Sequence, residues 1–127
     1  MSTEDIRPGA QEFYAMHGGS DAWRTYTMYG TWDDANQTGE VIDLTGATLT
    51  ANFFDADGNL VFTADAVTVD APTTGLFIIK PGKTNTIAHA ETEFEDGMMW
   101  GLHVVWSDAS ESIEMYGGWD IGKDLTV

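Results

Sequence analysis

Hydrophobic and polar residues alternate with a period of two over much of this chain. The clearest alternation runs through residues 48–53, stops at an Asp57-Gly58 turn and resumes through residues 60–62. Alternation on both sides of an Asp-Gly pair is the strongest short-range signal for a β-hairpin. We therefore expect a hairpin over residues 43–64 and a fold that is built around it.

A second hairpin is predicted in the last third of the chain. Residues 98–106 place Trp100 and other large side chains on one face, a polar turn follows, and residues 113–121 return. Gly117-Gly118 in the returning segment indicates a bulge or a close approach of backbone segments.

Further extended segments fill the middle of the chain. They are residues 24–32, 41–42, 66–69 and 76–80. The last of these is almost continuously apolar, which predicts a central strand covered on both faces. Residues 84–93 have helical character, with Thr84 or Asn85 as the N-cap. About seven to eight short strands with frequent turn signals predict an all-β fold, specifically an antiparallel immunoglobulin-like β-sandwich.

Residues 1–22 are predicted to form an N-terminal arm, and residues 23–127 the β-sandwich domain. Gly-containing pairs punctuate the arm, and the piece between them could form at most two helical turns. Phe13, Tyr14 and Met16 are large apolar side chains in this arm. They either cover an open end of the core or dock on a neighbouring subunit, because terminal segments stay disordered unless something holds them.

Composition narrows the classes of function. The 127 residues suit one domain, and the absence of cysteine excludes disulfides and thiolate sites. The polar, acidic N-terminus does not resemble a signal peptide, and no apolar run reaches the roughly 18 residues that span a bilayer. The net charge of −16, from 21 acidic and 5 basic residues, argues against binding to nucleic acids or anionic membranes. Scattered carboxylates favour adaptation to high salt over docking on a basic partner.

Candidate chemistry is weak throughout the chain. Residues 55–59 resemble a calcium loop superficially, but glycine is the fourth residue of the run and Ala66 stands where a ligating Glu is needed. His17, His89 and His103 share no ligand-like spacing. The carboxylates of residues 91–96 fit a solvated acidic loop better than an acid–base pair. We therefore expect no catalytic, cofactor-binding or metal-binding residues, no cofactor and no enzymatic activity.

Five tryptophans are the other notable feature, because a core of this size can bury two or three. Core packing is the expectation for Trp100. Trp23 and Trp32 flank the first long strand, and exposed aromatic residues mark protein interfaces or sugar-stacking platforms. Our interface candidates are therefore Phe13, Tyr14, Met16, Trp23 and Trp32, with a carbohydrate-binding site as the alternative use of the tryptophans.

The order of the motifs resembles a known family, the small immunoglobulin-like β-sandwich domains of tailed-virus virion proteins (BppU N-terminal and LtfC-like domains). The matching motifs are Asp43-Leu44-Thr45-Gly46-Ala47, the turn at Asp57-Gly58, the strand from Gly75 to Pro81, the segment 84–87 and the aromatic hairpin of residues 98–121. The resemblance covers roughly residues 24–125.

This resemblance implies a structural component of a tailed-virus particle, in the neck, the tail or baseplate, or on the capsid surface. It implies other virion proteins as partners, with a homo-oligomer or multiple copies in a symmetric assembly, and a location in virions assembled in the host cytoplasm. The acidity suggests a salt-loving host. The alternative function is a carbohydrate-binding module.

Overall fold

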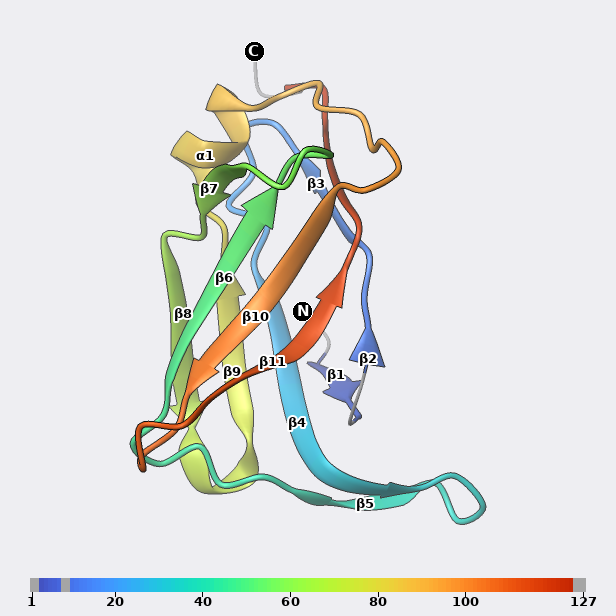
Figure 1. The fold of residues 1–127 in the computed structure, drawn as a ribbon, viewed down its shortest axis with the longest axis vertical. Coiled ribbons are helices and arrows are strands. Elements are labelled where there is room, and N and C mark those ends of the chain that lie inside the picture. The colour runs from blue at the N-terminus through green and yellow to red at the C-terminus, as the bar shows by residue number, and fades with distance from the viewer. Residues whose placement is uncertain (1–2, 8–9, 125–127) are drawn as a thin grey trace.

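The computed structural model describes residues 3–7 and 10–124, and it confirms the all-β sandwich (Figure 1). One sheet has the order β1-β4-β9-β8 with β5 also paired to β4, the other has the order β2-β11-β10-β6-β7, and β12 pairs with β3. The first sheet contains β1 (Thr3–Ile6), β4 (Arg24–Asp33), β5 (Thr38–Val41), β8 (Ala66–Ala71) and β9 (Leu76–Lys80). The second sheet contains β2 (Ala10–Gln11), β6 (Thr48–Phe54), β7 (Leu60–Thr63), β10 (Met99–Val105) and β11 (Glu111–Gly117). The remaining elements are β3 (Tyr14–His17), β12 (Trp119–Gly122), the 3₁₀ turn η1 (Pro72–Thr74) and the helix α1 (Lys83–Ala88).

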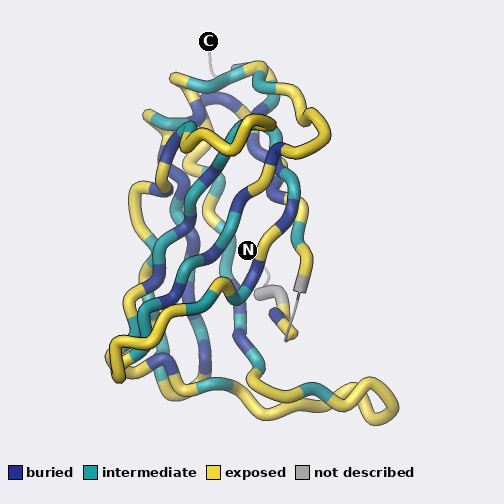
Figure 2. Tube along the Cα trace, viewed as in Figure 1, coloured by how far each residue is buried: buried dark blue, intermediate teal, exposed yellow. Residues whose placement is uncertain are grey.

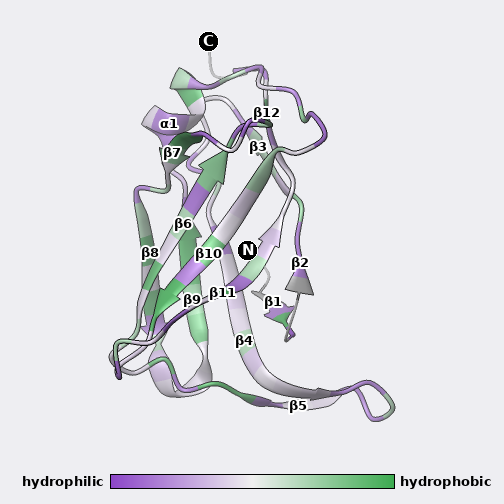
Figure 3. Cartoon of the chain, in the orientation of Figure 1, coloured by the Kyte–Doolittle hydropathy of each residue, from purple (hydrophilic) through white to green (hydrophobic). Residues whose placement is uncertain are grey.

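Both predicted hairpins are confirmed. β6 and β7 pair in antiparallel fashion with Phe53 opposite Phe62, and β10 and β11 pair with Trp100 opposite Gly117. Burial alternates residue by residue along β6 and β10, and Figure 3 shows one hydrophilic band interrupting the hydrophobic residues of each strand. Because successive side chains of a strand point to opposite faces, this alternation buries one face of the second sheet and exposes the other.

The predicted central strand is confirmed in its position and corrected in its burial. β9 lies between β4 and β8. Phe77 and Ile79 are fully buried, whereas Leu76 and Ile78 are only half-buried. Leu76 and Ile78 lie on the outer face of the first sheet, which is only partly covered. The apolar run of β9 is therefore fully buried on its inner face alone.

The predicted N-terminal arm is instead part of the sandwich. β1 pairs in parallel with β4, β2 with β11, and β3 with β12. Residues 10–11 and 14–16 therefore lie in strands, joined by Glu12 and Phe13, rather than in helical turns. The three pairings are parallel, so the sandwich is not entirely antiparallel, and they raise the strand number above the seven to eight expected. Residues 1–2, 8–9 and 125–127 of the predicted segments lie outside the described residues.

Gly117-Gly118 makes the close approach that the sequence predicts. The segment that joins β11 to β12 runs here beside the segment that joins β2 to β3. The Tyr14 N–H donates to the Gly118 carbonyl at 2.9 Å. A Cβ on Gly117 would stand 2.0 Å from the Glu12 carbonyl oxygen. Only glycine allows the two segments to pass at this distance.

An aromatic cluster forms the centre of the core. The Phe53 ring stacks on Phe62 at 4.5 Å and on Trp100 at 5.8 Å, and it meets Tyr14 and Trp119 edge-to-face at 5.6 Å each. The five rings come from β3, β6, β7, β10 and β12. This confirms the core role of Trp100 and shows that Tyr14, from the N-terminal segment, is part of the cluster.

The short helix α1 begins differently from the prediction. Its N-cap is Gly82, at φ 100°, and the helix start has no side-chain cap. Asn85 instead uses its amide to donate to the Pro81 carbonyl at 2.9 Å, inside the first turn. In the part of the chain that the structure describes, no helix has the length and apolar character to cross a membrane.

Candidate functional site

The five interface candidates separate into buried and exposed residues. Tyr14 and Met16 are buried in the chain's own core, so of the two roles considered for them the structure shows the covering role. Phe13 and Trp23 are 44% and 45% exposed, and Trp32 is half-buried. The strand period explains the division, because Tyr14 and Met16 lie on the inward face of β3 while Phe13 precedes that strand.

Phe13 is one half of an exposed aromatic pair. Its ring meets Phe94 edge-to-face, with centroids 5.4 Å apart, and both rings lie against Gly118. Trp23, in contrast, is covered on one face by Lys80, whose Nζ stands 4.5 Å above the ring centroid. Both sites expose aromatic surface of the kind that protein interfaces use.

Arg24 holds the N-terminal strands in place. Its guanidinium donates to the Phe13 carbonyl at 3.0 Å and to the Ala15 carbonyl at 3.1 Å, and it lies 4.2 Å from the centroid of Tyr14. Burial lowers the pKa of Arg24, but a side-chain hydrogen bond and charge interaction with Tyr26, together with Tyr14 and Glu12, outweigh burial and raise it overall. One of the five basic residues thus has a structural role.

Trp32 lies in the β4–β5 hairpin, which projects beyond the sandwich and is largely exposed (Figure 2). Its ring contacts Tyr29 at 5.1 Å, and the guanidinium of Arg7 lies 4.2 Å from its centroid. Its indole N–H is buried and meets no acceptor among the described residues. A pocket of about 310 Å³ beside it is lined by Asp33 and Glu40 among others. A sugar could stack on the Arg7 side of this ring only by displacing Arg7.

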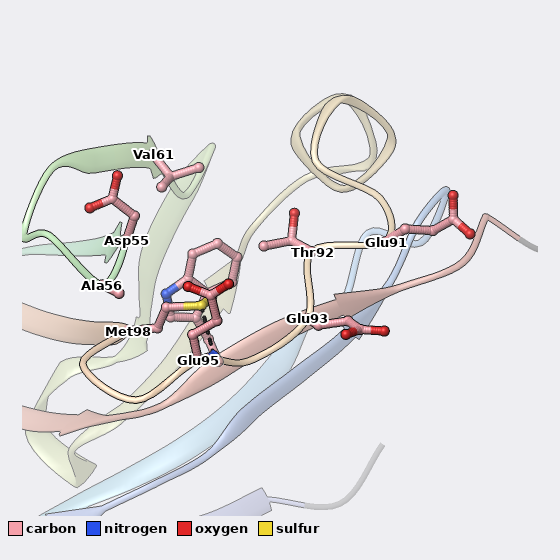
Figure 4. Close-up of a pocket in the computed structure, with 9 residues that line it drawn as sticks. Asp55, Ala56, Val61, Glu91, Thr92, Glu93, Glu95 and Met98 are labelled. Carbon is pink, nitrogen blue, oxygen red and sulfur yellow. Dashed lines mark hydrogen bonds between the residues drawn. The ribbon is translucent and has the colours of Figure 1, made fainter.

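An acidic concavity lies beside the segment that follows α1 (Figure 4). This pocket of about 410 Å³ is lined by Asp55, Glu91, Glu93 and Glu95, with apolar walls that include Met98. Figure 4 shows the carboxylates of Glu91 and Glu93 directed away from those of Asp55 and Glu95. An ion site or an acid–base pair needs converging carboxylates, and these do not converge. This matches the solvated acidic loop that the sequence predicts for residues 91–96.

The residues 55–59 form a hairpin turn, as predicted. The Asp55 carboxylate accepts the backbone N–H groups of Asp57 and Asn59, each at 2.9 Å, so one of its oxygens is used inside the turn. Within residues 3–7 and 10–124, no three side chains of the His, Cys, Asp or Glu types are grouped so as to hold a metal ion.

Two of the histidines make structural contacts. His103 lies on the β10 face opposite Trp100 and Leu102, as predicted, and its Nε2 is 2.9 Å from Oε1 of Glu111 on β11. His89 stacks on Phe62 with ring centroids 5.5 Å apart.

The same local hydrogen-bonding pattern stabilises other turns. The Asp43 carboxylate accepts from the N–H and the hydroxyl of Thr45, at 2.9 and 2.6 Å, and Asp108 accepts from Ser110 in the same way. The side-chain and then the backbone hydrogen bonds lower the pKa of both carboxyl groups. The Asp43-Leu44-Thr45-Gly46 motif is therefore a turn-forming element.

Sequence reasoning missed one surface, the outer face of the second sheet. Leu60, Met99, Ile113 and Tyr116 are all exposed there. For Met99 and Tyr116 the signal was present in the alternation, because their neighbours along the strand are buried. Leu60 and Ile113 lie beside register shifts, where simple alternation fails.

Comparison with known proteins adds little to this geometry. No family model matches the chain, and no curated protein matches it. Among solved structures, it is similar to CopC from Methylosinus trichosporium OB3b, with a TM-score of 0.41 and 12% sequence identity over 89% of this chain and 86% of that one. At this level of likeness, no residue role or activity is transferred.

Proposed function

We propose that this chain is a structural component of a tailed-virus particle and acts by protein–protein assembly. The observation that carries the proposal is the order of its motifs, from the Asp43 turn through the Asp57-Gly58 hairpin to the aromatic hairpin of residues 98–121, set on a β-sandwich. This order resembles the BppU N-terminal and LtfC-like virion domains.

Two further features support an assembly role. Aromatic side chains at Phe13, Phe94 and Trp23 are exposed, and large apolar residues protrude from the second sheet. The net charge of −16 suits a particle in concentrated salt, where screening over about 3 Å at 1 M allows acidic proteins to pack closely.

The direct test is the protein content of virus particles from the source culture. Particles purified by density gradient would be probed with an antibody raised against the recombinant chain, and immunogold labelling would give the position on the particle. The proposal requires the chain to co-purify with intact particles. Its presence only in the soluble fraction of infected cells would refute the proposal.

A carbohydrate-binding module remains the second candidate, favoured by the exposure of Trp23. Glycan-array binding that is lost in Trp23→Ala would support it, because stacking on a sugar needs the indole face. Binding that persists in Trp23→Ala would exclude this residue as the sugar platform.

A further inference from the structure

The outer face of the second sheet concentrates exposed apolar surface. Among the described residues, nine large hydrophobic side chains are exposed, and four of them lie on this one face. These four residues are Leu60, Met99, Ile113 and Tyr116. Large apolar residues scattered singly over a surface are ordinary, but a group on one sheet face marks an interaction site.

The strand register places these side chains in adjacent rows. Leu60 on β7 and Met99 on β10 are both paired with Phe54 on β6, so the three form one row across the sheet. Two residues along β10, Gly101 pairs with Tyr116. The next row contains His103, which pairs with Ile113. Directly paired residues point to the same face, so the apolar side chains extend across four strands.

The charge distribution is the second observation. β6, β7 and β10 contain neither Asp, Glu, Lys nor Arg, in a chain with 21 acidic residues. On the neighbouring β11, the acidic residues are Glu111, which contacts His103, and Glu114 at the bulge. The loops at the two ends of these strands are acidic, with Asp55 and Asp57 at one end and Asp108 at the other. Most of these carboxylates therefore lie at the border of the face. Glu111 lies on it, paired with Val105 in the row beyond His103 and Ile113, and Asn52 and Thr63 add uncharged polar side chains to the second row.

We propose that this face is a self-association surface and that its occupant is a second copy of the same chain. A basic partner would be matched by a face rich in carboxylates, and β7, β6 and β10 lack them. Two copies that each carry −16 can approach closely where like charges stay at the rim, and this face provides that geometry. A face-to-face dimer about a two-fold axis uses the same patch on both copies.

Salt controls the association. At about 0.1 M salt the Debye length is about 10 Å, so the acidic rims of two copies repel each other, whereas at about 1 M it is about 3 Å. Burial of the apolar rows is not weakened by this screening. The dimer should therefore form at high salt and dissociate at low salt. The inference rests on the proposed assembly role for its biological meaning, but the test below measures self-association alone.

The experiment measures the mass of the full chain by light scattering at about 0.1 M and about 1 M KCl. The wild type is expected to reach twice the monomer mass at high salt. Ile113→Asp, at a side chain 58% exposed, should weaken association about tenfold or more because it places an unpaired charge in the contact. Ile87→Asp is the matched control, with the same charge change at an isoleucine 46% exposed on α1.

A wild type that stays monomeric in high salt would overturn the proposal, as would dimers of Ile113→Asp equal to the wild type. An equal loss of self-association in Ile113→Asp and Ile87→Asp would also overturn it, because the added charge, and not its position on the second sheet, would then explain the loss. Circular dichroism verifies folding of each variant. Leu60→Asp, at a residue 56% exposed in the first row, supplies the same readout if Ile113→Asp does not fold. Failure of this test would leave co-purification with virus particles as a separate question.

Discussion

Removal of residues 1–22 should unfold this protein, although the sequence suggests a separable arm. The cut deletes β1, β2 and β3 together with three buried side chains, Ile6, Tyr14 and Met16. Truncation of one buried Ile or Met costs about 2–5 kcal/mol, and of one buried aromatic residue about 3–5 kcal/mol. The three side chains together are therefore worth at least about 7 kcal/mol, against a total stability of about 5–15 kcal/mol for a typical domain.

The assay is urea unfolding of the 23–127 fragment and the full chain, followed by circular dichroism in about 1 M salt to screen repulsion. We expect the fragment to lack a cooperative transition. Phe13→Ala is the control within the same segment, and because this ring is exposed its cost should stay near 0.5–1 kcal/mol, on the order of other surface changes. A cooperative transition of the fragment at the midpoint of the full chain would refute the reasoning.

Three further outcomes follow from the same contacts. Gly117→Ala should destabilise the fold by several kcal/mol, because its Cβ would stand 2.0 Å from the Glu12 carbonyl oxygen; an unchanged thermal midpoint would contradict this. Arg24→Met should cost about 1–3 kcal/mol in urea unfolding, since the Phe13 and Ala15 carbonyls lose a charged donor, and Lys83→Met on the exposed surface should cost far less. Because the pKa values of the Asp43 and Asp108 carboxyl groups are lowered in the folded state, their hydrogen bonds stabilise the fold above the unfolded pKa of about 3.9, and this stabilisation is lost as pH falls through the folded values. Asp108→Asn should therefore lose less stability on acidification in high salt than the wild type does.

The sequence predicted those parts of the fold that are local. The Asp57-Gly58 hairpin and the aromatic hairpin of residues 98–121 join strands that are close in the chain, so alternation and turn residues suffice to find them. The central position of β9 also followed from its apolar run. The two hairpins supply four of the five strands of the second sheet and the buried role of Trp100.

The N-terminal strands could not be found in this way. Tyr14 pairs with Trp119, more than a hundred residues later, and each N-terminal strand spans four residues or fewer. Alternation over so short a stretch does not separate a strand from an irregular segment. The interface candidates depended on this pairing, because Tyr14 and Met16 are surface residues in a free arm and core residues in a strand. Phe13 and Trp23 lie outside the strands, so their exposure does not depend on which strands pair.

The parallel pairing of β3 with β12 also has a mechanical consequence. β3 lies toward the beginning of the chain and β12 toward its end, and their backbones run in the same direction. A pull that separates the two ends of the chain would load the β1–β4 and β2–β11 pairs first, and would then slide β3 and β12 past each other along their length. The hydrogen bonds from Tyr14–Trp119 to His17–Gly122 would then bear the load together instead of opening one after another. The β3–β12 pair would therefore resist such a pull in shear, the direction in which paired strands are hardest to separate.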